Sequence, residues 1–126
     1  MSLNVLIVDD SKLARVSVAK ALSALRPDWS RVEASNADEA VQAIESQAIH
    51  LALLDFNMPG RDGLELAGEI RRSQPEMVIA VVSANHQDEI VSRALEVGAA
   101  FLPKPLTEAV LKAFLDASAP RLKAGS

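Results

Sequence analysis

Short, mostly apolar runs that end at polar or charged residues recur along this chain and constrain its fold more than any other feature. Four runs cover residues 3–8, 50–55, 77–82 and 100–102, and a weaker fifth segment covers 31–34. Strands that are apolar along their whole length have both faces buried, which is typical of a parallel sheet covered by helices on each side. The runs therefore predict five strands of one parallel sheet.

Apolar residues at helical spacing follow each predicted strand. The predicted helices cover about 12–25, 37–48, 63–74, 88–97 and 108–118. Strands that alternate with helices, without long spacers, predict an α/β fold with helices on both faces of the sheet. We therefore expect one domain over residues 1–126. Its core is expected at about 4–118, with a tail or the start of a linker at 119–126.

Polar residues are available to cap the predicted helices. Ser11 or Asp10 is placed to cap the first helix, and Asn36 with Glu39 resembles a capping box. Thr107 is expected at the start of the last helix, which we predict to end at about Ser118. Gly98 is expected just after the fourth helix.

Composition and charge exclude several classes of function. The formal net charge is -4, and there is no basic stripe, so direct binding to nucleic acid is not expected. The chain has no cysteine, which excludes disulfides and thiolate metal sites. The apolar run near the N-terminus is too short for a signal peptide or a membrane span. We expect a cytoplasmic protein without a membrane segment.

Polar side chains stand where the predicted strands end. In an open parallel sheet, ligands bind beyond the carboxyl ends of the strands, where strand order reverses. Three carboxylates at one edge would repel each other unless a cation joined them, and Mg²⁺ prefers oxygen ligands. A hydroxyl and an amine there can hold a phosphoryl group against a carboxylate nucleophile. The residues concerned are Asp9, Asp10, Asp55, Ser83 and Lys104.

Each of these residues, taken alone, has a plainer explanation. Asp9 and Asp10 are suited to the positive start of a helix. Asp55 is suited to an Asx turn, Ser83 to a loop and Lys104 to a solvated surface. Their joint occurrence at successive strand ends favours a phosphoryl site over four separate explanations.

The motifs at these strand ends resemble those of a known family, the receiver domain of two-component response regulators in its CheY-like form. The resemblance covers about residues 4–118 and implies a flavodoxin-like (βα)5 fold, with a five-stranded parallel sheet of order 2-1-3-4-5. The motifs that carry it are Val8-Asp9-Asp10-Ser11, Asp55-Phe56-Asn57-Met58-Pro59-Gly60, Val82-Ser83-Ala84 and Lys104-Pro105.

The resemblance implies a phosphoacceptor and a metal site. Asp55 would accept the phosphoryl group. Mg²⁺ would be bound directly by Asp10, Asp55 and the backbone carbonyl of Asn57, while Asp9 would act on the ion largely through water. Asn57 and Asn85 are further expected to flank the crevice and to influence the rate at which the phosphoryl group is hydrolysed.

The resemblance also implies a switch. Ser83 and Lys104 would contact phosphoryl oxygens, and the Lys104–Pro105 peptide bond would be cis. Phe101 would turn inward when Ser83 moves toward the phosphoryl group, although a plain core role for Phe101 is an equal alternative. The signal would be read on the face made by the fourth helix, the fifth strand and the fifth helix.

The implied partners are proteins. A sensor histidine kinase or a phosphotransfer protein would supply the phosphoryl group, and a downstream target or an output domain would read the signal. Surplus apolar residues on the fourth and fifth helices suggest a partner surface, or else two core stripes, and leave open a phosphorylation-dependent dimer. The residues concerned are Val91, Leu95, Val110, Leu111, Phe114 and Leu115.

Two other classes of function are weaker. A phosphatase of the haloacid dehalogenase type also uses an aspartate nucleophile and magnesium, but it needs a second aspartate two residues later. Asn57 stands there after Asp55, and Ser11 after Asp9, so we do not expect a turnover enzyme. A receiver that acts only as a binding scaffold is disfavoured because the acidic, hydroxyl and lysine residues are all present.

Overall fold

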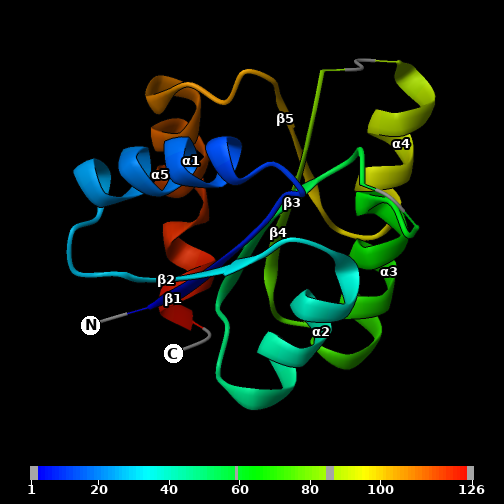
Figure 1. The fold of residues 1–126 in the computed structure, drawn as a ribbon, viewed down its shortest axis with the longest axis horizontal. Coiled ribbons are helices and arrows are strands. Elements are labelled where there is room, and N and C mark those ends of the chain that lie inside the picture. Colours follow the sequence, from blue (N-terminus) through cyan, green and yellow to red (C-terminus); the bar gives the residue numbers. More distant parts are fainter. Residues whose placement is uncertain (1–2, 59, 85–86, 125–126) are drawn as a thin grey trace.

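A five-stranded parallel sheet forms the centre of the computed structural model, which describes residues 3–58, 60–84 and 87–124 (Figure 1). The strand order is β2-β1-β3-β4-β5, and every neighbouring pair is parallel. This order and the predicted α/β class are confirmed. The strands are β1 (Asn4–Val8), β2 (Ser30–Ala34), β3 (Leu51–Asp55), β4 (Val78–Ser83) and β5 (Ala100–Pro103).

Helices cover both faces of the sheet, as the apolar strands require. Figure 1 shows α1 and α5 side by side on one face, with α2, α3 and α4 on the other. β3 and β4 are buried along their whole length. Among the described residues, no helix is both long enough and apolar enough to cross a membrane. The helices are α1 (Lys12–Leu25), α2 (Ala37–Ser46), α3 (Gly63–Ser73), α4 (Asp88–Glu96) and α5 (Glu108–Ala124).

Two of the predicted caps are confirmed and one is altered. Ser11 accepts a hydrogen bond from the backbone of Ala14, and Thr107 caps α5 in the same way. Asn36 caps α2, but the Glu39 side chain bonds to Ser35 instead of completing a capping box. A full capping box that was not predicted occurs at the start of α3, from Asp62 and Glu65.

The last helix is longer than predicted. We expected it to end at about Ser118, but α5 continues through Pro120 to Ala124, so the tail expected from 119 is helical up to that point. A proline inside a helix removes a hydrogen bond and costs about 3 kcal/mol. Leu122 is 6% exposed and packs into the core beneath α1 and α5. Burial of a leucine stabilises by about 1.5–3 kcal/mol, which offsets much of that cost.

Arg71 of α3 joins two segments on the face covered by α2, α3 and α4. Its guanidinium donates hydrogen bonds to the carbonyls of Val97 and Gly98, at 2.9 Å each, just beyond α4. It also donates to the carbonyls of Pro75 and Met77, before β4, at 2.9 and 2.7 Å. Gly98 has a φ of +69°, which confirms the predicted glycine at the end of α4.

Candidate functional site

The strand order places the polar strand ends side by side. Asp9 directly follows β1, Asp55 ends β3, Ser83 ends β4 and Lys104 directly follows β5. These four strands are neighbours in the sheet, so their carboxyl ends form one edge. The point where strand order reverses lies between β1 and β3, which is where ligands bind in sheets of this kind.

Three aspartates form an acidic cluster at this edge. A carboxylate oxygen from each of Asp9, Asp10 and Asp55 lies within 4.8 Å of the others. Asp9 and Asp55 are buried, whereas Asp10 is exposed. Carboxylates at this spacing repel each other unless a cation lies among or beside them.

Lys104 supplies one positive charge to the cluster. Its Nζ lies 2.7 Å from Asp55 Oδ1 and 3.6 Å from Asp9 Oδ2. Burial alone would lower the pKa of Lys104, but the hydrogen bond and charge of Asp55, together with Asp9, outweigh burial and raise it. The lysine is therefore held as a cation against the buried carboxylates. The Lys104–Pro105 peptide bond is cis, as predicted.

Asp55 is the most deeply buried carboxylate of the cluster. Burial raises the pKa of Asp55, and the charge of Asp9 adds to this, while the hydrogen bonds from Lys104 and the Asn57 backbone lower it. The net direction is upward. A cation bound beside Asp55 would therefore favour the carboxylate form that a nucleophile requires.

The donor set fits a magnesium ion. Mg²⁺ binds hard oxygen ligands and keeps several waters, so a few carboxylates at one edge are sufficient. Asp9, Asp10 and Asp55 supply such oxygens within 4.8 Å of one another. Asn57 lies in the loop just after β3, and its backbone N–H is 3.4 Å from Asp55 Oδ1. The direct ligation by the Asn57 carbonyl remains a prediction.

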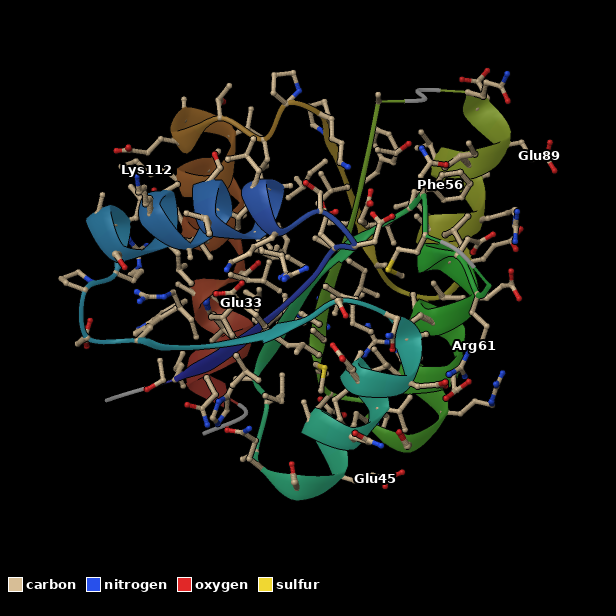
Figure 2. All side chains as sticks on the ribbon, in the orientation of Figure 1. Glu33, Glu45, Phe56, Arg61, Glu89 and Lys112 are labelled. Carbon is tan, nitrogen blue, oxygen red and sulfur yellow. The ribbon has the colours of Figure 1, made fainter. Side chains whose placement is uncertain are left out.

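Arg15 positions the end of β1, a role that was not predicted from the sequence. Its Nη1 donates to the backbone carbonyl of Asp9 at 2.6 Å, and its Nε pairs with Glu33 at 3.0 Å. Glu33 lies on β2, as Figure 2 shows. Asp9 also accepts a hydrogen bond from the Ser11 backbone at 2.9 Å. Only the contact between distant segments reveals this role, because a lone arginine on a helix carries no specific signal.

Gly63 lets α3 begin directly against the end of β3, which carries Asp55. A Cβ at this position would lie 2.5 Å from the backbone oxygen of Asp55 and 2.9 Å from Phe56 Cα. The backbone N–H of Gly63 donates to the carbonyl of Phe56 at 3.0 Å. The helical spacing predicted Gly63 within a helix, but no local pattern indicated this close approach to Asp55.

Arg61 holds the loop between β3 and α3 against two helices (Figure 2). Its guanidinium pairs with Asp38 of α2 at 2.6 Å and with Glu69 of α3. The hydrogen bond with Glu69, and the charges of both carboxylates, raise the pKa of Arg61. This loop carries Asn57, so Arg61 contributes to the placement of the segment next to Asp55.

The residues expected to form the switch lie on neighbouring strands. Ser83 is fully buried at the end of β4, and Phe101 of β5 stands opposite Val81 in the strand register. Phe101 is half-buried and packs against the core on the side of α2, α3 and α4. This position is compatible with both alternatives for Phe101, so the switch remains a prediction. Asn85 lies outside the described residues.

The surplus apolar residues on α4 and α5 fall into three groups by exposure. Leu111 and Leu115 are fully buried in the core, so they are not part of a partner surface. Leu95 is 66% exposed on α4. The remaining three, Val91, Val110 and Phe114, are half-buried.

A comparison with known proteins agrees with this geometry. The family model described as the response regulator receiver domain matches residues 5–116. The chain belongs to this family. The receiver domain is 40% identical over 123 residues to the positive alginate biosynthesis regulatory protein of Pseudomonas aeruginosa, covering 94% of this chain and 48% of that protein. It spans about half the length of curated relatives such as this one.

Solved structures share the fold of this receiver domain. A CheY-like receiver domain protein from Methanospirillum hungatei matches with a TM-score of 0.90 and 24% identity, covering 100% of both chains. A chain of the CheX-CheY-BeF3-Mg²⁺ complex from Borrelia burgdorferi matches with a TM-score of 0.85 and 26% identity. That match covers 93% of this chain and 89% of that one.

Proposed function

We propose that this receiver domain accepts a phosphoryl group on Asp55 with Mg²⁺ bound and thereby switches the binding of a protein partner. The observation that carries the proposal is the pairing of the buried Asp55 with Lys104 at 2.7 Å, inside a cluster of three aspartates. A solved relative is named as a complex with BeF3 and Mg²⁺. Asp10 and the carbonyl of Asn57 would bind the ion directly together with Asp55, and Asp9 would act on it largely through water.

The chemistry is a phosphoryl transfer between two proteins. A sensor histidine kinase or a phosphotransfer protein presents a phosphohistidine. A carboxylate oxygen of Asp55 forms a bond to phosphorus as the phosphorus–nitrogen bond breaks, and the electron pair leaves with the imidazole. Lys104 and the hydroxyl of Ser83 hold the phosphoryl oxygens. Bound Mg²⁺ supplies charge neutralisation, which together with positioning dominates such transfers.

The readout is a change of surface. Phosphorylation adds charge and acceptor oxygens that a two-state element must sense. In this proposal Ser83 moves toward the phosphoryl group, Phe101 turns inward, and the α4-β5-α5 face changes its affinity for a target, an output domain or a second copy. Leu95, exposed on α4, is a suitable contact on that face. The domain promotes its own phosphorylation and the later hydrolysis of its acyl phosphate, and it does not turn over a separate substrate.

Two parts of the proposal rest on the family alone. They are the cytoplasmic location and the assignment of residues 1–126 to one receiver domain, whose matched part is 5–116.

Asn57 and Asn85 would tune the hydrolysis rate, because both are expected beside the crevice. Replacing either with a bulky or charged residue is expected to change the lifetime of the phosphorylated form, and unchanged lifetimes in both variants would contradict this role.

The deciding experiment is intact mass after incubation with Mg²⁺ and a small phosphodonor such as acetyl phosphate. The wild-type protein is expected to gain one phosphoryl group, and Asp55→Asn is expected to gain none. Asp88→Asn, at the exposed start of α4, is the matched control and is expected to behave as wild type. No gain in wild type, with Mg²⁺ binding demonstrated, would instead favour a binding scaffold.

The proposed switch has a separate test. Backbone NMR spectra before and after phosphorylation are expected to show the largest shifts, away from Asp55 itself, on α4, β5 and α5. Shifts confined to the loops around Asp55 would contradict the proposed output face while leaving the phosphoacceptor intact.

A further inference from the structure

A hollow of about 450 Å³ opens at the carboxyl edge of the sheet, on the face covered by α1 and α5 (Figure 1). The sheet forms its floor. Leu53 lies two residues before Asp55 on β3, and side chains two apart on a strand share a face. The hollow therefore runs from Asp55 back along the sheet. Small-molecule sites typically enclose roughly 300–1,000 Å³, so this one is large enough for a small ligand.

Small side chains on α1 leave this space open. Ser17 and Val18 follow Ala14 by three and four residues, so all three lie on one face of the helix, and all three line the hollow. A methyl group at Ala14 and a hydroxymethyl group at Ser17 fill little of the gap between α1 and the sheet. Ser17 and Pro105 are exposed lining residues, so the hollow is accessible from solvent.

The part of the lining that lies away from Asp55 is apolar. Ile7, Leu53 and Val82 contribute to it from three neighbouring strands, and the half-buried Leu106 contributes from the loop after β5. The hydroxyl of Ser17 is the one uncharged polar side-chain group among the described lining residues. A wall of this kind favours a hydrocarbon group and disfavours a polar or charged group that would lack partners.

The end of the hollow at Asp55 carries an excess of negative charge. Asp9, Asp55 and Lys104 line this end, and Asp10 completes the acidic cluster. Among the described residues, Lys104 is the one cationic side chain that pairs with these carboxylates, and it is already shared between Asp55 and Asp9. Arg15 donates to the backbone carbonyl of Asp9 and not to its carboxylate. In the ionised cluster, three carboxylates against one lysine leave two negative charges, which attract a cation and repel an anion.

We propose that this hollow binds a small amphiphilic cation, a primary alkylammonium ion, and that the bound ion competes with Mg²⁺ at the acidic cluster. The hydrocarbon tail lies along the apolar floor formed by Leu53 and its neighbours. The ammonium group donates hydrogen bonds to the carboxylates of Asp9 and Asp55, and each of its three N–H groups can find an acceptor there or in water. The competition with Mg²⁺ rests on the function proposed above, whereas binding to the hollow does not depend on phosphorylation.

Charge distinguishes the ammonium group from other head groups. A carboxylate or phosphate head would stand beside Asp9 and Asp55 with only the engaged Lys104 to offset the repulsion. A hydroxyl head would form neutral donor bonds, and hydrogen bonds between charged partners are roughly twice as strong. Mg²⁺ neutralises both uncompensated charges, whereas an ammonium ion neutralises one. The ammonium ion therefore competes with Mg²⁺ only through the burial of its tail, and a longer tail competes better.

The experiment is an NMR titration of the wild-type domain in Mg²⁺-free buffer with hexylammonium chloride, hexanol and sodium hexanoate, followed on the methyl groups of Leu53 and Val82. Hexylammonium is expected to bind about fivefold or more tightly than hexanol, and hexanoate more weakly than both. Hexylammonium is also expected to bind about four- to sixteenfold more tightly than butylammonium, because each buried methylene adds up to about fourfold. Equal affinities for hexylammonium and hexanol would overturn the proposed ligand class.

The competition has its own titration. Mg²⁺ at about ten times its dissociation constant is expected to weaken hexylammonium binding about tenfold, because a competitor reduces the free site by mass action. Hexanol, which carries no charge, is expected to keep its affinity. Hexylammonium binding that Mg²⁺ leaves unchanged would overturn the competition.

Two variants fill the hollow from different sides, Ser17→Leu on α1 and Leu106→Phe after β5. Both are expected to lose the dependence of affinity on tail length, so that hexylammonium binds no better than butylammonium. Ser92→Leu and Leu95→Phe make the same two replacements at exposed positions of α4, on the other face of the sheet. These controls are expected to follow wild type. A tail-length dependence that persists in both filled variants would place the binding elsewhere and overturn the site.

The outcomes separate this inference from the proposed function. Absence of hexylammonium binding to a wild-type domain that acetyl phosphate still labels on Asp55 overturns the cation site and leaves the phosphoacceptor in place. Selective hexylammonium binding to a domain that no phosphodonor labels overturns the proposed function and supports the cation site.

Discussion

Arg71 offers the clearest quantitative test of what holds this domain together. Its guanidinium donates to the carbonyls of Val97, Gly98, Pro75 and Met77 at 2.7–2.9 Å. Burial lowers the pKa of Arg71, and the charge of Arg121 lowers it further, but a guanidinium stays protonated at neutral pH. One side chain therefore fixes the end of α4 to the segment before β4.

The loss of stability expected when Arg71 is replaced depends on which of these carbonyls can be hydrated by water instead. Arg71→Met keeps the aliphatic stem and removes all donors. Pro75 and Gly98 are exposed, so water can hydrate their carbonyls. Met77 is 4% exposed and Val97 is half-buried, so these two lose a partner without full compensation. An unsatisfied buried carbonyl costs about 1–3 kcal/mol, and two of them, discounted for partial exposure, give about 2–3 kcal/mol.

Urea unfolding of the purified domain measures this loss directly. Arg71→Met is expected to reduce the free energy of unfolding by about 2–3 kcal/mol, with a thermal midpoint lowered by roughly 10 °C. Arg71→Lys keeps the charge on a smaller donor group and is expected to lose about half as much. Arg72→Met, at the exposed neighbouring position, is the control and should change stability by less than about 0.5 kcal/mol. Equal stabilities of Arg71→Met and Arg72→Met would refute the reasoning.

Three further predictions concern other single contacts. Gly63→Ala places a Cβ 2.5 Å from a backbone oxygen and is expected to destabilise the folded domain by about 1–3 kcal/mol in urea unfolding. Gly68→Ala is the control, because a Cβ there meets no atom nearer than 3.9 Å, and it should not lower the stability. Arg15→Met releases the backbone of Asp9 and is expected to weaken Mg²⁺ binding about tenfold; an unchanged affinity in a magnesium titration would show that the anchor is dispensable. Hydrogen bonds from two cations lower the pKa of Asp116 below its ordinary value of 3.8, so its contribution to stability is present above that pH and is lost as pH falls through the lower folded value. Carboxyl NMR titration would contradict this if Asp116 titrated at or above 3.8.

Local patterns in the sequence were sufficient to predict the helices and strands and their order along the chain. The apolar runs of β3 and β4 are buried along their whole length, because a strand buried on both faces must be apolar at consecutive positions. Ser11 and Thr107 cap the helices that they precede. These features depend on residues within a few positions of each other, and the motifs at the strand ends then indicated the family.

The candidate site was predictable as a set of residues but not as a geometry. The carboxyl ends of neighbouring parallel strands must share an edge, so Asp9, Asp55 and Lys104 were expected to lie together. The distances from Lys104 to Asp55, 2.7 Å, and to Asp9, 3.6 Å, could not be predicted from the sequence. Those distances depend on the sheet register and on the path of the chain after β5.

By itself the sequence determined the α/β class, the family and the residues gathered at one edge of the sheet, because periodicity and strand-end motifs are local properties of the chain. Only the tertiary structure decided that α5 continues through Pro120, because the burial of Leu122 favours the helix there. It also decided the close approach at Gly63, the carbonyl contacts of Arg71 and the hollow beside Asp55. Each of these depends on contacts between segments far apart in the chain, which no local pattern encodes.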